Sequence, residues 1–225
     1  MTAGAVAVLA LVAVAQAAPS GAGVDLKGKL YRAVFYTGPG TLSAGDLTGV
    51  PEPLRERLNR FLARRAAFTS QYTHEASSFD QARADAKKRD VERAIVGLID
   101  TPGIERRALE FVQSARIVFD WKGSPEAPLG EAAAAEEFLK QEPSSPLAPY
   151  LYVFIAHRQR AAFEAHDRAQ NVEGMKAASK KYKTFVQRAR SAGDSIFGLI
   201  ADDLDRQPHV YLKTDQHPGT FDPDA

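Results

Sequence analysis

From residue 54 to residue 207, apolar side chains recur at the three- and four-residue spacing of amphipathic α-helices. No other feature of the sequence limits the possible folds as strongly, because helix-spaced apolar residues do not fit a sheet. The pattern predicts helices at residues 54–68, 80–99, 104–119, 126–141, 147–167, 172–192 and 194–206. Helices joined by short turns pack as antiparallel neighbours. The chain is therefore predicted to be all-α, either an antiparallel helical bundle or a short helical-hairpin solenoid.

One of these helices is expected to lie at the centre of the protein. Its first part, residues 147–156, is apolar nearly all the way round. Leu151, Phe154 and Ile155 point in different directions from the helix axis, so a helix of this composition needs neighbours on several sides. We therefore predict that all three side chains are buried.

The residues outside the helical domain (54–207) have a different composition. Residues 18–53 are rich in glycine and proline around one β-prone run, residues 30–36, which Gly28 and the Gly38-Pro39-Gly40 turn enclose. This region is predicted to be an extended or loop-like N-terminal arm, in which residues 30–36 form either a short strand or part of the extended chain. Residues 208–225 contain three prolines and are predicted to be a non-helical tail.

The first residues match a secretory signal peptide. Residues 3–15 carry no charge, and Ala15-Gln16-Ala17 gives the small-x-small pattern of a cleavage site. A basic residue before the apolar run is missing, since only Met1 and Thr2 precede it. An uncleaved anchor is the alternative, but a membrane-spanning helix needs about 20 apolar residues. We expect residues 1–17 to be a signal peptide and the protein to be exported, as a periplasmic or secreted protein.

Composition excludes several classes of function. Among the 225 residues, 29 are Lys or Arg and 28 are Asp or Glu, so the net charge is +1. Nucleic-acid binding needs an excess of positive charge to neutralise phosphates, and is therefore not expected. The chain has no cysteine, which excludes disulfides, thiolate zinc sites and thiol nucleophiles. No cofactor is expected.

The histidines do not form a metal-binding motif, because no H-x-x-x-H or E-x-x-H pair occurs. His157 and Glu164 are seven residues apart on one predicted helix and thus lie on nearly the same face. One interpretation makes His157 a partly buried residue with a hydrogen bond. The other makes it a general base in a cleft, oriented by Glu164.

Charge is unevenly distributed along the chain. Five arginines between residues 55 and 65 face one glutamate, and six cations between residues 176 and 190 face no acidic residue. Residues 202–225 carry six aspartates against two cations. Such blocks are often solvated faces, but a basic strip can also bind an acidic partner or an anionic membrane surface. The candidate partner-binding residues are Arg55, Arg60, Arg64, Trp121, Lys176, Lys180 and Lys183.

Residues 129–163 resemble a tetratricopeptide-like helical repeat unit of bacterial envelope proteins. Leu129-Gly130 and Ala133 are followed by the sequence pattern A-x-x-F-L…P-x-S-x-x-A, which residues 135–139 and 143–148 form. The family spaces its units by about 34 residues, and no second Leu-Gly pair stands at Phe163. The resemblance implies helical hairpins, a concave face and a protein or peptide partner, and it implies no catalytic residues.

These observations favour an exported, non-enzymatic helical interaction or scaffold protein of a bacterial-type cell envelope or the extracellular space. Such a protein would bind a protein or peptide partner in a groove between helices. The alternative is a small hydrolase or ligand-binding enzyme with a cleft near His157 and Glu164.

Overall fold

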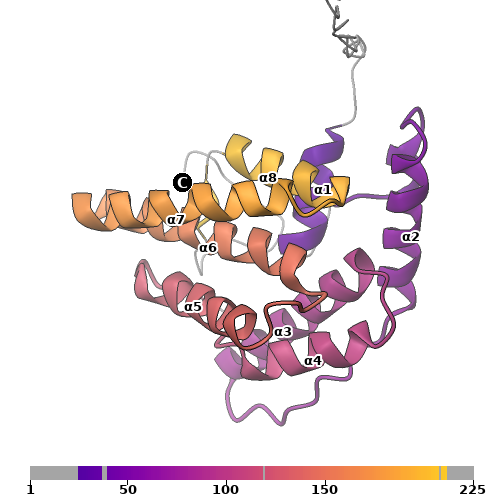
Figure 1. Ribbon diagram of the computed structural model, residues 1–225. Coiled ribbons are helices and arrows are strands. Elements are labelled where there is room, and N and C mark those ends of the chain that lie inside the picture. Colours follow the sequence, from indigo (N-terminus) through magenta and orange to yellow (C-terminus); the bar gives the residue numbers. More distant parts are fainter. Residues whose placement is uncertain (1–24, 37–39, 119, 208, 212–225) are drawn as a thin grey trace, which may run out of the picture.

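The computed structural model describes residues 25–36, 40–118, 120–207 and 209–211 (Figure 1). These residues contain helices and no strand, which confirms the all-α prediction. The helices are α1 (Leu26–Phe35), α2 (Leu54–Ala67), α3 (Phe79–Leu98), α4 (Ile104–Ser114), α5 (Glu126–Gln141), α6 (Ala148–Arg168), α7 (Val172–Arg190) and α8 (Ser195–Arg206), with a 3-10 turn, η1 (Ala44–Leu47). The predicted signal peptide and residues 212–225 lie outside the described residues.

Helix α6 occupies the centre of the helical domain. It packs against α5, α7 and α8, and α6 and α7 run side by side in Figure 1. Leu151, Phe154 and Ile155 are completely buried, as the sequence predicts. A second group consists of α2, α3 and α4, which pack in succession along the chain, while α1 lies against α8.

The predicted strand at residues 30–36 is wrong, because residues 26–35 form α1. Asp25 begins this helix by accepting a hydrogen bond from the backbone N–H of Gly28 at 3.1 Å. Leu30, Tyr31 and Val34 lie on one face of the helix and are buried in the core. Burial of this face outweighs the weak strand preference of its aromatic and β-branched residues.

The predicted helix at residues 104–119 is too long, since α4 ends at Ser114. Ala115 has extended backbone angles, residues 116–118 have no regular secondary structure, and the backbone N–H of Val118 donates to Glu131 at 3.1 Å. The apolar periodicity continues past Ser114 because Ala115 and Ile117 are buried as well. At this position a buried non-helical segment and a buried helix therefore give the same pattern of apolar residues in the sequence.

Buried carboxylates of the helices hold the irregular segments in place. Asp85 of α3 accepts the Tyr72 hydroxyl at 2.9 Å, and Glu92, two turns further on, accepts Ser70 and the backbone N–H of Gln71. Glu131 of α5 binds the indole N–H of Trp121 at 2.9 Å. Each of these acids is at most 3% exposed, and each accepts at least one hydrogen bond from a loop.

No helix of the described part of the chain is long and apolar enough to cross a membrane.

Replacing Phe154 by alanine tests whether α6 is the central element. Phe154 is completely buried and packs edge-on against Phe111, so the loss of the ring is expected to lower the free energy of unfolding by about 3–5 kcal/mol. Phe79→Ala is the matched control, because that ring is 73% exposed, and a change within about 0.5 kcal/mol is expected. Urea unfolding of both variants measures the difference, and equal losses would contradict the assignment of α6 as the core helix.

Candidate partner-binding site

The structure separates the predicted basic residues into those that serve the fold and those that face solvent. Arg64 serves the fold. Its guanidinium donates to the carbonyl oxygens of Val96 at 2.9 Å and Ile99 at 3.0 Å, and pairs with Asp100 at 2.7 Å. These carbonyls lie at the end of α3, where no further helical N–H is available to them. Arg64 therefore caps α3, together with Arg57, which bonds the carbonyl of Leu98.

Arg55 and Arg60 are exposed on α2, but both form ion pairs close by in the sequence. Arg55 pairs with Glu52 at 2.8 Å, and Arg60 pairs with Glu56 one turn away. Exposed pairs of this kind contribute little to stability. They nevertheless reduce the positive charge that this surface offers to a partner.

Trp121 contributes to the wall of a groove between α3 and residues 117–127, but it is only 1% exposed and offers almost no surface to a partner. It lies in a buried polar cluster in which Glu131 accepts the indole N–H with one oxygen and the Arg158 guanidinium with the other, at 3.0 Å. The Arg158 guanidinium carbon also lies 3.7 Å from the centre of the Phe154 ring. The cluster thus pairs Glu131 of α5 with Arg158 of α6 inside the core.

The three lysines of the prediction line one groove between α6 and α7. Lys176, Lys180 and Lys183 are spaced by four and three residues and share one face of α7. The groove has a volume of about 470 Å³, and no carboxylate contributes to its wall. Its other lining residues are Phe163, Val172, Met175 and Ser179.

Two of these lysines have no ion partner among the described residues. Lys181, on another face of α7, pairs with Glu136 of α5 at 2.8 Å, and Arg190 pairs with Asp202 and Asp205 of α8. Lys176 pairs with Glu173 in its own helix at 2.9 Å. Within the described part of the chain, no acidic side chain pairs with Lys180 or Lys183. We refer to the groove with Lys176, Lys180 and Lys183 as the basic groove.

Local sequence explains how α7 forms this wall. The Asn171 side chain caps the helix by accepting the Gly174 N–H at 2.9 Å. Gly174 also allows α6 to approach, because a Cβ atom there would lie 2.4 Å from the His166 ring. The opposite face of α7 is anchored in the core by Tyr182, Phe185 and Val186. The lysines are thus directed away from the core.

The apolar floor of the basic groove was not identified from the sequence. Phe163 and Met175 are half-buried, and Val172 is 57% exposed. The residues of α7 that line the groove have the spacing of one helical face, and this spacing is visible in the sequence at positions 172, 175, 176, 179, 180 and 183. The pattern is weak, because three lysines stand among the few apolar residues of this face.

His157 is buried and not accessible from a cleft. It is 1% exposed, and its ring stacks on Phe35 with centroids 4.3 Å apart. Its Nδ1 atom lies 3.5 Å from an Arg158 nitrogen, and its Nε2 atom has no hydrogen-bond partner in the described structure. Burial, and secondarily the nearby positive charge of Arg158, lower the pKa of His157 well below 6.5, so the ring is neutral.

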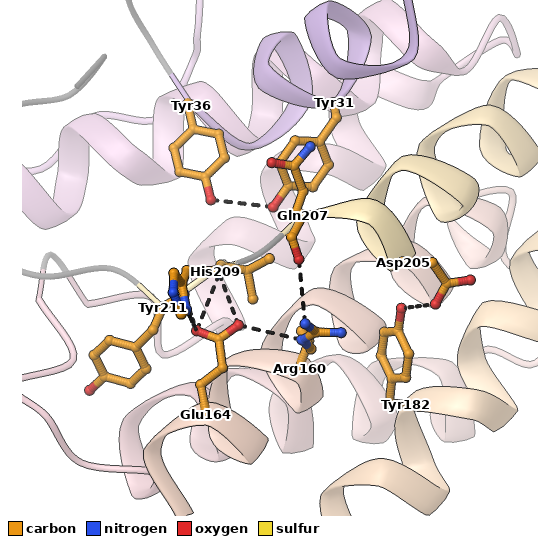
Figure 2. A network of polar contacts seen from close by, with 10 residues as sticks. Tyr31, Tyr36, Arg160, Glu164, Tyr182, Asp205, Gln207, His209 and Tyr211 are labelled. Carbon is orange, nitrogen blue, oxygen red and sulfur yellow. Dashed lines mark hydrogen bonds and ion pairs between the residues drawn. The ribbon is translucent and has the colours of Figure 1, made fainter. Parts of the chain in front are cut away.

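Glu164 serves a structural purpose that the sequence does not reveal. Its carboxylate accepts the backbone N–H groups of Val210 at 3.0 Å and Tyr211 at 3.1 Å. Figure 2 shows His209 and Tyr211 beside this carboxylate. The Nε atom of Arg160 lies 3.4 Å and the Nδ1 atom of His209 lies 3.9 Å from an oxygen of the same carboxylate. No hydrogen bond or ion pair of the described residues joins Glu164 to His157. The predicted orientation of His157 by Glu164 is therefore not found.

A second groove, of about 540 Å³, lies between α3 and residues 117–127. Its lining includes Asp80, Asp85 and Asp120 as well as Lys88 and Lys122. Because both signs of charge line it, this groove favours no particular charge in a ligand. In the described structure, no group of three or more His, Asp or Glu side chains could hold a metal ion.

Comparisons with known proteins add no relative: no family model, no curated protein and no solved structure matches the chain.

Arg64→Ala is expected to lower the free energy of unfolding by about 1–3 kcal/mol, because the terminal carbonyls of α3 lose their donors. Arg60→Ala, in the same helix, removes only an exposed ion pair and should change the free energy of unfolding by less than about 0.5 kcal/mol. Chemical unfolding of both variants tests this assignment. Equal effects would show that Arg64 does not cap α3.

The buried state of His157 predicts a dependence of stability on pH. Below a pH of about 6.5 the unfolded chain protonates this histidine while the folded chain does not, so the folded state loses stability as the pH falls. Urea midpoints measured between pH about 7 and about 5 should decrease, and His157→Gln should make this decrease smaller. An unchanged slope in the variant would show that His157 titrates normally in the folded protein.

Proposed function

We propose that this protein is a non-enzymatic interaction protein whose basic groove binds an acidic segment of a protein partner. One observation carries the proposal: Lys180 and Lys183 have no ion partner in the described structure and flank a recess with an apolar floor. The resemblance of residues 129–163 to a tetratricopeptide-like unit supports the same class of partner. These residues fall in α5, α6 and the turn between them.

The groove offers two kinds of interaction to one ligand. Lysine ammonium groups attract carboxylates, and the first turn of α7 adds the positive end of the helix dipole beside Val172. The floor offers contact to an apolar side chain, which gains about 25 cal/mol for each Å² removed from water. A segment with two or three carboxylates around one leucine or phenylalanine would use both.

The apolar floor of the site favours a peptide over an anionic membrane. Phe163, Val172 and Met175 lie beside the lysines, so a ligand that brings an apolar side chain together with carboxylates matches the groove better than headgroups alone. Lysines on a flat surface would attract lipid headgroups without such a floor. Binding to a membrane is therefore an alternative outcome of the experiment below.

We do not propose the alternative of a hydrolase or ligand-binding enzyme near His157 and Glu164. A general base must reach the proton that it removes, and His157 is 1% exposed. The carboxylate of Glu164 is already occupied by two backbone N–H groups. Export by residues 1–17 stays part of the proposal and would place the basic groove outside the cytoplasm.

The probe for this proposal is a fluorescent synthetic peptide with three glutamates at helical spacing and one leucine. Its binding is measured by fluorescence anisotropy and should weaken at high salt, because exposed charges are screened. Lys180→Glu/Lys183→Glu should weaken binding at least about tenfold, since each of two attractive contacts becomes repulsive. The variant is expected to fold, because both lysines are exposed.

Two controls make this result specific. Arg55→Glu/Arg60→Glu changes the net charge equally on α2 and should leave binding within about twofold. A probe with glutamines in place of glutamates should not bind. Equal weakening by both double variants, or binding to anionic vesicles but not to the probe, would contradict the proposal.

A further inference from the structure

The last described residue leaves the core beside the end of α6. The Tyr211 N–H is bound by Glu164, its hydroxyl donates to the carbonyl of Trp121 at 2.8 Å, and Arg168 lies 5.6 Å from its ring. Figure 2 shows Tyr211 beside Glu164. Tyr211 is 5% exposed, so the point where residue 212 begins is fixed on the last turns of α6.

The basic groove lies on a neighbouring face of the same helix. Phe163, which forms part of its floor, precedes Glu164, and successive residues of an α-helix point about 100° apart. The two faces are thus separated by about one helix diameter, 10–12 Å. Nine residues, 212–220, reach up to about 30 Å when extended. Residue 221 is therefore within reach of the groove.

The composition of residues 212–225 complements the groove. The segment contains three aspartates and one lysine, and two of the aspartates flank Pro223 directly after an aromatic residue, in Phe221-Asp222-Pro223-Asp224. One apolar side chain beside two carboxylates is the ligand chemistry favoured by the floor and by Lys180 and Lys183, which have no ion partner among residues 25–211 as far as these are described.

We propose that residues 221–224 bind the basic groove of their own chain, with Phe221 on the apolar floor and Asp222 and Asp224 at the lysines. The inference rests on the proposed function and adds that partner binding is regulated, because an acidic partner must displace this segment from the basic groove. A ligand tethered by a short chain has an effective concentration on the order of millimolar, so a weak contact is enough to compete.

The first test uses the full chain and the glutamate–leucine probe. Phe221→Ser/Asp222→Asn/Asp224→Asn removes the internal competitor and should tighten probe binding about three- to tenfold. The control, Glu75→Gln/Asp80→Asn, raises the net charge equally at exposed positions of the loop before α3 and its first turn, and should leave binding within about twofold. Unchanged probe binding in the triple variant would overturn the inference, while the proposed function would stand.

The second test does not depend on the probe. Phe221→p-benzoylphenylalanine places a photoreactive ring at the proposed anchor, and mass spectrometry then locates the cross-link. A link within one chain to residues 172–183 is expected, and Lys180→Glu/Lys183→Glu should reduce its yield at least about threefold. Links to other regions, or between two chains, would overturn the inference. Failure of the probe to bind either protein would overturn the proposed function, whatever the cross-link shows.

Discussion

The buried carboxylates determine how the irregular segments of this protein lie against its helices. Asp85, Glu92 and Glu131 are nearly inaccessible, and an isolated charge at such a position would be very costly. Each accepts hydrogen bonds from hydroxyl, indole or backbone N–H groups of a loop, and Glu131 also accepts one from Arg158 of α6, so the loop and the acid stabilise each other. Glu164 does the same for residues 210 and 211. The loops are therefore part of the core of this helical protein.

The same requirement explains why so few of the cations are available to a partner. Arg57 and Arg64 satisfy carbonyls at the end of α3, and Arg158 neutralises Glu131 in the core. Lys181 and Arg190 join α7 to α5 and α8 through ion pairs. The face of α7 with Lys180 and Lys183 makes no such ion pair in the described structure, and this face meets an apolar floor. The candidate site is thus a part of the basic surface that the described fold does not use.

The basic groove and the exit of residue 212 are linked through α6. Glu164 fixes the chain at one face of this helix, and Phe163 contributes to the groove on the next. A structural carboxylate therefore determines where the acidic segment begins. Because residue 212 starts close to the groove, the short chain between them raises the local concentration of the acidic segment at the groove. An internal contact is therefore accessible even if the segment binds the groove weakly.

The sequence by itself determined the helices from residue 54 onward, the burial of Leu151, Phe154 and Ile155, and the common face of Lys176, Lys180 and Lys183. These features follow from helical periodicity, which is local. Only the tertiary structure decided that residues 26–35 are helical, because burial of their apolar face outweighs a weak local preference. It also decided that Arg64 and Trp121 serve the core while Lys180 and Lys183 have no ion partner in the described structure. Charge and aromatic character are visible in a sequence, but the partner of each group is set by residues far along the chain.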